Sequence, residues 1–268
     1  IWDHKRTNQE ILDNLSEAIS GDVNGLTGLW SADESFGDTV YDNSPNGLDG
    51  TVVNATFSES NNLVGRIRFV TESGAGNMDG TSWENASDDL QAMINDLGSE
   101  QTGEVWVAEG TYYPDASSRT KSFELNDYIK VYGGFTGNES SVDQRDWKNN
   151  RTILSGDLDQ NDTDADGDGL TDLNGQTGNN SYAVVRNNNI LNTAYLDGFY
   201  ITGGLANGDS PNNNGAAIFN GGSGSCSVVF ENIVVSGNHA GNNGAVFNNE
   251  TSYAVFKNSI FENNSADA

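Results

Sequence analysis

The chain has 268 residues, with 12 Lys or Arg against 39 Asp or Glu, and a net charge of −27. This charge excludes nucleic acid as a partner, because phosphate backbones require Lys and Arg. It fits attraction to divalent cations, although acidic surfaces are also common among secreted proteins without any specific role. The sequence has no apolar stretch long enough for a membrane span.

Residues 1–62 form the first predicted region. A polar start at Thr7-Asn8-Gln9-Glu10 and apolar residues at helical spacing predict a short helix over about 7–15. In their order, several motifs resemble the closing segment of LamG-like (concanavalin-type) jelly-roll modules: Ile1-Trp2-Asp3, Arg6-Thr7, Gly25 to Trp30 and Tyr41 to Thr51. The resemblance implies the C-terminal part of such a module followed by a linker, without its sugar- or calcium-binding rim.

Residues 63–268 form the second predicted region, which is rich in short strands. Leu90, Met93, Ile94 and Leu97 share one face of a predicted amphipathic helix. The remaining elements before the repeats are predicted strands at Arg66–Val70, Glu104–Pro114 (a strand and turn), Ile129–Phe135 and Arg151–Gly156.

Two segments near the C-terminus carry nearly the same sequence, since Val229–Ala240 reappears as Val255–Ala266, 26 residues later. Ala217–Asn220 likewise matches Ala245–Asn248, and a weaker third copy begins at Leu196. Self-similarity at a period of about 20–50 residues is typical of stacked repeats. Each repeat holds short runs of β-branched and aromatic residues separated by Asn, Gly and Ser, which predicts a β-helix.

The motifs upstream of the repeats resemble the opening of bacterial right-handed parallel β-helix repeat proteins of the Bacteroidetes, choice-of-anchor-like type. These motifs are Gly80–Trp83, Val105–Pro114, Val131–Glu139, Gln144–Trp147 and Ile153–Asp157, followed by Asn214–Asn220 and Asn243–Asn248. The resemblance implies an all-β, right-handed parallel β-helix over 63–268, with an N-terminal capping helix within 63–103 and rungs over 104–268 that continue beyond. It also implies a surface or secreted protein.

The matched residues of the repeats predict how the interior is built. Stacked rungs would place Asn220 on Asn248, Asn232 on Asn258 and Asn238 on Asn264 as amide ladders, which we favour over a role in binding sugars. A second set is expected to form an internal aromatic stack: Phe219, Phe230, Phe247, Phe256 and Phe261. Val234 is expected to point inward, and Cys226 to be a small core residue rather than a nucleophile.

The stretch from Asp157 to Asp172 carries the clearest chemical signal. Asp164, Asp166, Asp168 and Asp172 follow the spacing of a calcium loop, and Asp157, Asp159 and Asp162 are further possible ligands. Gly175 stands where an EF-hand has its bidentate acid, so the stretch looks more like the Asp-rich loops of thrombospondin type 3 repeats. We predict a structural Ca²⁺ here; the alternative is a solvated acidic insertion without an ion.

Signals for catalysis are weak, and we predict no catalytic residue. A polysaccharide lyase needs Arg or Lys beside a calcium and a base over the sugar. The nearest acid and base candidates, Asp197 and Arg186, have no spacing that brings them together, and His239 reads as a corner residue. Trp147, Tyr112 and Tyr113 are weak candidates for stacking on carbohydrate, and Trp83 either does the same or seats the helix.

Three hypotheses for function remain open. We favour a non-enzymatic protein on the outer surface of a Gram-negative bacterium, or secreted by it, that acts in adhesion or glycan binding with structural calcium. The second hypothesis is a polysaccharide lyase or glycoside hydrolase whose active rungs lie partly beyond this segment. The third is a passive stalk, or a cargo that a secretion translocon recognises.

Overall fold

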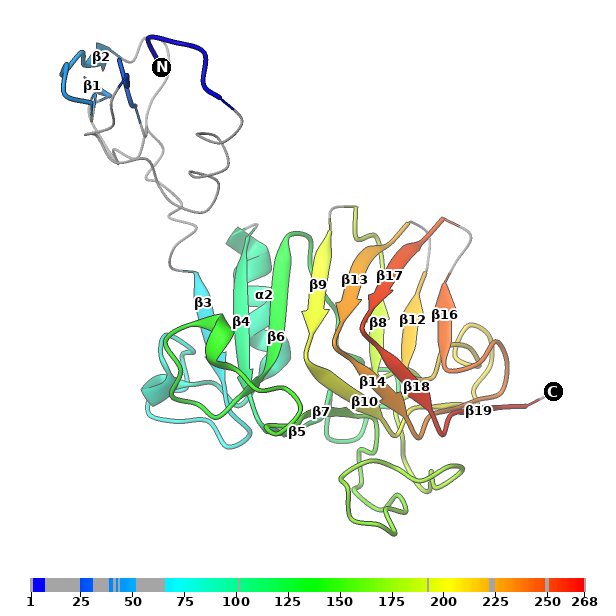
Figure 1. Ribbon diagram of the computed structural model, residues 1–268. Helices are drawn as coiled ribbons and strands as arrows, with labels where there is room; N and C mark the ends of the chain where they lie inside the picture. The colour runs from blue at the N-terminus through cyan, green and yellow to red at the C-terminus, as the bar shows by residue number, and fades with distance from the viewer. Residues whose placement is uncertain are drawn as a thin grey trace. The chain divides into compact units, whose positions relative to one another are not determined.

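The computed structural model describes the following residues: 2–7, 25–30, 39–40, 42, 44–51, 66–100, 102–191, 193–221, 225–248 and 251–267. The chain divides into two compact units, Ile1–Val64 and Gly65–Ala268. Within the described residues the secondary structure is mostly strand, with one α-helix and two short 3-10 helices (Figure 1). The fold is therefore all-β.

A buried carboxylate organises the described part of the first unit. Strand β1 (Thr39–Val40) pairs antiparallel with β2 (Gly50–Thr51), and Asp42 accepts hydrogen bonds from the N–H groups of Leu29, Ser44 and Leu48. Burial alone would raise the pKa of Asp42, but N–H donors from Leu29, Leu48 and Ser44 lower it well below its usual range. The helix expected after Thr7 lies outside the described residues.

The described residues of the second unit contain four sheets, and every strand pair in them is parallel. The six-stranded sheet contains, in spatial order, β17 (Tyr253–Lys257), β13 (Ser227–Glu231), β9 (Ala194–Asp197), β6 (Ile129–Phe135), β4 (Gly103–Ala108) and β3 (Ile67–Val70). The five-stranded sheet contains β18 (Ile260–Glu262), β14 (Val234–Ser236), β10 (Phe199–Thr202), β7 (Thr152–Ser155) and β5 (Gly110–Tyr112). The two small sheets are β16 (Val246–Asn248), β12 (Ile218–Asn220), β8 (Val185–Asn187), and β11 (Leu205–Ala206), β15 (His239–Ala240), β19 (Ser265–Ala266).

From β9 onward the chain visits these sheets in a fixed order. The series β9 to β12 is followed by β13 to β16 and then by β17 to β19, and each strand pairs with its equivalent in the next series (Figure 1). Val229 pairs with Val255 and Ile218 with Val246, as the sequence repeat predicts. The weaker third copy is confirmed as well, since Asp197 pairs with Glu231.

The bend after each strand of the six-stranded sheet explains the abundance of Gly and Asn. Gly198, Asn232 and Asn258 occupy this bend in successive series, with φ values of 85°, 51° and 46°. Gly adopts this left-handed backbone without a steric penalty, and Asn tolerates it better than other side chains do. Either of the two residue types can therefore occupy this structural position.

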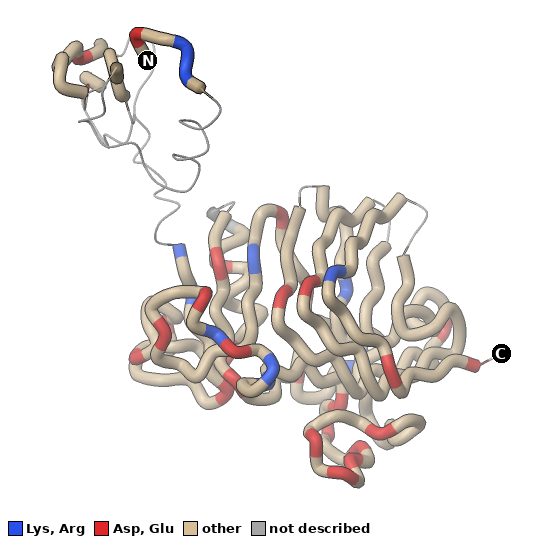
Figure 2. Tube along the Cα trace, in the orientation of Figure 1, with Lys and Arg blue, Asp and Glu red and all other residues tan. Residues whose placement is uncertain are grey.

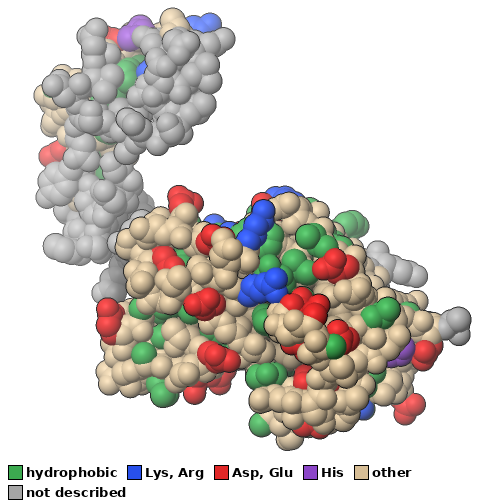
Figure 3. Space-filling model, turned by 60° about the horizontal axis from the view of Figure 1, so that its bottom comes forward, with side chains coloured by type: hydrophobic (Ala, Val, Ile, Leu, Met, Phe, Trp, Pro, Cys, Tyr) green, Lys and Arg blue, Asp and Glu red, His purple; other side chains and the backbone are tan. Residues whose placement is uncertain are grey.

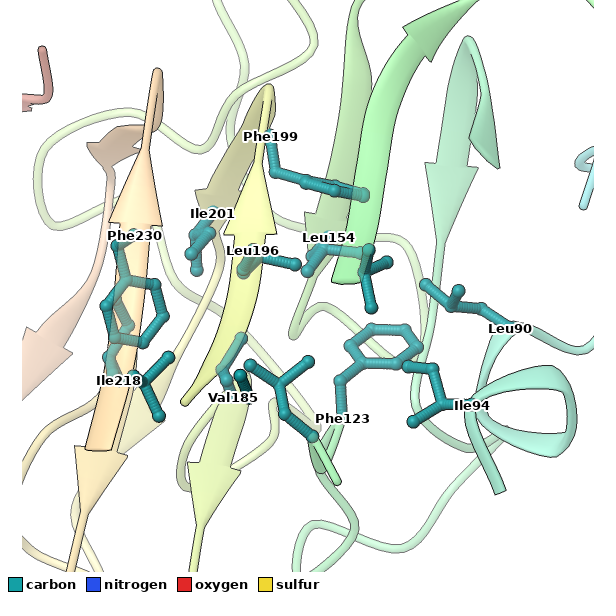
Figure 4. Packing of buried hydrophobic residues seen from close by; sticks show 14 of the residues in the cluster. Leu90, Ile94, Phe123, Leu154, Val185, Leu196, Phe199, Ile201, Ile218 and Phe230 are labelled. Carbon is teal, nitrogen blue, oxygen red and sulfur yellow. The ribbon is translucent and has the colours of Figure 1, made fainter. Parts of the chain in front are cut away.

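One continuous hydrophobic cluster fills the space between the sheets. It runs from helix α2 (Leu90–Glu100) to the last strands, and includes Leu196, Ile218 and Phe230 (Figure 4). Leu90, Ile94 and Leu97 are 3%, 1% and 0% exposed, because the apolar face of α2 packs against β3, β4 and β6. The predicted amphipathic helix is thus confirmed, and burying each such side chain stabilises the fold by roughly 1.5–3 kcal/mol.

Two predictions about strands need correction. The segment Glu104–Pro114, predicted as a strand and turn, contains parts of two strands, β4 and β5, in different sheets. The chain turns between them at Gly110, whose φ of 140° favours glycine.

Val234 is the second error, because it does not point into the main cluster. Its neighbours Ile233 and Val235 belong to that cluster, and alternate residues of a strand face opposite sides. Val234 is buried on the other face of β14, with Ile153 and Leu170. Leu170 belongs to the acidic segment, so this segment covers part of the sheet's outer face.

Candidate functional site

The acidic segment leaves the sheets after β7 and returns before β8. Its two ends meet where Asp157 and Asn180 form a β-bridge, and Leu170 packs back onto Ile153. The segment between these anchors projects from the sheets and carries a dense group of acidic residues (Figure 2). The sheets therefore hold an exposed acidic loop at a defined place.

Three carboxylates gather at the tip of this loop. Asp164, Asp166 and Asp168 each offer one oxygen, and these oxygens all lie within 4.8 Å of one another on exposed side chains. Asp164 also accepts bonds from the N–H groups of Gly167 at 2.8 Å and Gly169 at 3.0 Å, which bend the chain around it. Converging carboxylate oxygens on a tight, glycine-containing turn are the donor set that a hard cation prefers.

Asp172, the fourth expected ligand, is not brought to the same point. Its Oδ2 accepts a bond from the N–H of Ala165 at 3.0 Å, and its own N–H donates to the carbonyl oxygen of Thr163. Asp172 thus closes the loop on itself, and only three of the four expected ligands converge.

The three further candidate ligands, Asp157, Asp159 and Asp162, accept hydrogen bonds at the base of the loop. Asp157 Oδ2 accepts from the N–H of Asp162 at 2.9 Å, and Asp159 Oδ1 accepts from that of Asn179 at 3.0 Å. Asp162 Oδ1 accepts from the N–H of Thr177 at 2.7 Å. Burial, followed by the charge of Asp157, raises the pKa of Asp162.

A basic residue that the sequence analysis missed links the loop tip to the sheets. Arg151 Nη1 donates to the carbonyl oxygen of Asp168 at 2.7 Å and lies 3.8 Å from Asp168 Oδ2. The guanidinium also lies over the ring of Tyr200, 5.1 Å from its centroid. Arg151 therefore holds the tip in place and partly neutralises its charge.

Tyr112 and Tyr113 lie in a different place, where they line a hollow of about 790 Å³. Tyr112 is 4% exposed and its hydroxyl donates to the carbonyl oxygen of Ala108 at 3.0 Å, so this ring belongs to the floor. Tyr113 is half-buried. Of the two, Tyr113 is the better placed to contact a ligand.

The tryptophan candidates are held by neighbouring side chains. Trp147 is half-buried against the cluster of Val234 and Tyr200, and Lys148 Nζ lies 5.3 Å from its ring centroid. Trp83 packs edge-on against Phe69, with ring centroids 4.8 Å apart. Its Nε1 donates to the carbonyl oxygen of Glu139.

The asparagine ladders are confirmed. Asn220 donates to Asn248 at 2.8 Å, Asn238 donates to Asn264 at 3.0 Å, and Asn258 bonds to Asn232. The structure adds Asn187, which donates to Asn220 at 2.8 Å. These amides satisfy one another and so serve the fold.

The aromatic stack is confirmed in part. Phe230 stacks on Phe256 at 5.0 Å, and Phe230 belongs to the main cluster. Phe219 stacks on Phe247 at 4.9 Å, but these two rings lie outside that cluster. The guanidinium of Arg186 covers Phe219, 4.3 Å from its ring centroid.

Asp197 and Arg186 are not brought together. Asp197 instead forms an ion pair with Arg145 at 2.6 Å, with side chains 11% and 13% exposed, and accepts a bond from Asn232 at 2.8 Å. Arg186 donates to Asn212. His239 bonds to Ser265 at 2.8 Å, as its corner position suggests.

Cys226 is buried, and its Sγ contacts the carbonyl oxygen of Asn187, in line with its expected role as a core residue. Across the described helices, none combines the length and the apolar character that crossing a membrane requires.

Comparison with known proteins gives no relative: the sequence matches no protein-family model, no curated protein and no solved structure.

Proposed function

We propose that residues 63–268 form a right-handed parallel β-helix, and that residues 1–62 are the C-terminal part of a LamG-like module with a linker. Support for the β-helix comes from the fixed order in which the chain visits its parallel sheets. The handedness rests on the near-universal right-handed crossover between parallel strands. A crystal structure of the full chain tests both statements; left-handed crossovers between the sheets, or a first unit that is not part of a jelly roll, would contradict them.

The function that we propose is that of a non-enzymatic extracellular or cell-surface protein of a Gram-negative, Bacteroidetes-type bacterium, acting in adhesion or glycan binding. The observation that carries this proposal is the hollow of about 790 Å³ that Tyr113 lines. Its size lies within the roughly 300–1,000 Å³ typical of small-ligand sites. Residues within the sheets, by contrast, bond to their own repeats, as Asn220 does to Asn248.

Ca²⁺ is the proposed structural ion of the acidic loop. Asp164, Asp166 and Asp168 would hold it, with Asp172 as a further ligand if the loop rearranges on binding. The ion would neutralise carboxylates that otherwise repel one another and so order the loop. Calorimetric titration with CaCl₂ tests this; no heat and no change in melting temperature at millimolar calcium would contradict it.

A glycan array probed with the purified chain, with and without calcium, tests the binding function. Binding without turnover is the expected result. Products that are shortened or unsaturated would instead support a polysaccharide lyase or glycoside hydrolase, which is the second candidate. The observation that favours this candidate is the group of carboxylates on the rim of the hollow, which includes Asp88 and Asp115.

Hydrogen bonds from two N–H groups lower the pKa of Asp115, so it would act as a carboxylate rather than as an acid. A chain that neither binds nor cleaves any glycan would be a passive stalk or a cargo of a secretion translocon.

A further inference from the structure

The hollow lies where five segments far apart in the sequence meet, two of which are represented by Glu72 and Phe123. The rest of the lining comes from the start of α2 at Asp89 and Leu90, from the turn after β5 at Tyr113 to Asp115, and from the start of the acidic segment at Leu158. None of these segments forms the site alone, so sequence motifs do not reveal it.

The floor of the hollow is apolar. Leu90, Tyr112, Phe123 and Leu158 line it and are between 2% and 6% exposed. Apolar and aromatic surface of this kind packs against the C–H groups of a sugar ring, as it does against other apolar ligands. The half-buried ring of Tyr113 adds aromatic surface to the lining.

The charged residues of the lining are all acidic. Glu72, Asp88, Asp89 and Asp115 contribute carboxylates, and no Lys, Arg or His is among the lining residues that the structure describes. On the face shown in Figure 3, acidic side chains are more widespread than basic ones. A ligand in this hollow therefore meets negative charge from several directions.

Backbone hydrogen bonds hold three of these carboxylates in place. Asp89 accepts from the N–H of Ala92 at 2.8 Å as the N-cap of α2, and Glu72 accepts from that of Thr111 at 3.3 Å. Asp115 accepts from the N–H groups of the turn that follows it. Asp88 is exposed and has no ion-pair partner within the described part of the chain.

The pKa of Tyr113 reflects the same acidic surroundings. Burial raises the pKa of Tyr113, and the charges of Asp157 and Glu72 raise it further. A further negative charge in the hollow is thus disfavoured, whereas a positive charge is favoured.

We propose that the hollow binds a saccharide that carries a primary ammonium group, an amino sugar. This inference rests on the proposed glycan-binding function and names its ligand class. The sugar ring packs on the apolar floor, while its ammonium group pairs with the rim carboxylates, Asp88 in particular. Uronic acids and sulfated sugars are repelled from this hollow because their charge has the same sign as the rim.

The experiment is calorimetric titration of the full chain with a short glucosamine oligosaccharide, with its fully N-acetylated counterpart and with an oligolysine of equal charge. The glucosamine oligosaccharide is expected to bind at least about tenfold more tightly than either of the others, and more weakly as salt rises. Equal binding of the acetylated sugar, or of oligolysine, would overturn the proposal.

Two variants locate the site. Asp88→Asn keeps the shape of an exposed side chain and is expected to weaken glucosamine binding about tenfold. The matched control is Asp143→Asn, at an exposed carboxylate outside the hollow, and leaves binding unchanged. Unaltered binding by Asp88→Asn would overturn the assignment.

The outcomes also separate this inference from the proposed function. A neutral glycan that binds regardless of Asp88→Asn would refute the amino-sugar site and leave glycan binding intact. Absence of binding to any glycan would refute both.

Discussion

The repeats over residues 194–267 and the acidic segment over residues 157–180 differ in the hydrogen-bond partners of their polar side chains. In the repeats, an amide such as Asn220 finds its partner in an identical amide of the next strand. In the acidic segment, carboxylates such as Asp164 are bonded by their own turn and remain exposed. Regular stacking therefore pairs polar side chains with one another, whereas an interruption of the stack leaves its carboxylates exposed.

The largest effect is expected from placing a charge inside the stack. Val235→Asp buries an unpaired carboxylate in the main cluster and should lower the free energy of unfolding by about 3–5 kcal/mol. Val255→Asp is the matched control, because this side chain is 47% exposed on the last strand of its sheet, and should cost about 0.5 kcal/mol or less. Urea unfolding measures both. Equal losses would mean that Val235 does not point into the main cluster.

Calcium should stabilise the acidic segment through its tip. At a concentration of about 100 Kd, binding adds about 2.7 kcal/mol to the free energy of unfolding. Asp166→Asn removes one of the three converging carboxylates and should abolish this gain, while it leaves the calcium-free melting temperature unchanged or slightly higher. Glu262→Gln, at an exposed residue of the stack, is the control and should keep the gain. A variant at Asp166 that responds to calcium like the wild type would exclude this site.

Breaking an amide ladder should have a smaller effect that depends on position. Asn220→Ala leaves the buried Asn187 amide without its acceptor and should cost about 1–3 kcal/mol. Asn248 is exposed at the end of the same ladder, so Asn248→Ala should cost about 1 kcal/mol or less. Thermal unfolding compares the two variants. If the end residue mattered as much as the middle one, the ladder account would fail.

The smallest effect concerns pH. Because the folded state raises the pKa of Asp162, the folded chain holds this proton at a pH where the unfolded chain has lost it. This contribution to stability is present below the ordinary Asp pKa of about 3.9 and is lost as pH rises through the raised value. Asp162→Asn should therefore flatten the fall in melting temperature over this range in metal-free buffer. An unchanged slope would rule out Asp162 as its cause.

The repeats could be predicted from the sequence because identical residues stack on one another. The match of Val229 with Val255 gave the strand register directly, and the matched Asn residues gave the ladders. The face of Val234 could not be predicted in the same way, since a shift of one residue reverses the side to which a strand residue points.

The candidate site could be predicted only where it is local. Asp164, Asp166 and Asp168 lie close in sequence and converge as expected, but Asp172 turns back to bond to Ala165. The hollow could not be predicted, because Glu72 and Leu158 meet there only through the fold. The same holds for the pair of Arg145 and Asp197, which are 52 residues apart.

Hydrogen exchange with and without calcium tests the central claim, that the acidic segment binds the ion and the repeats supply stability. Our account predicts slower exchange on adding calcium at residues 167–170, whose N–H groups donate to the three carboxylates, and no change over residues 194–267. Unchanged exchange in the acidic segment, or protection spread along the repeats, would contradict it.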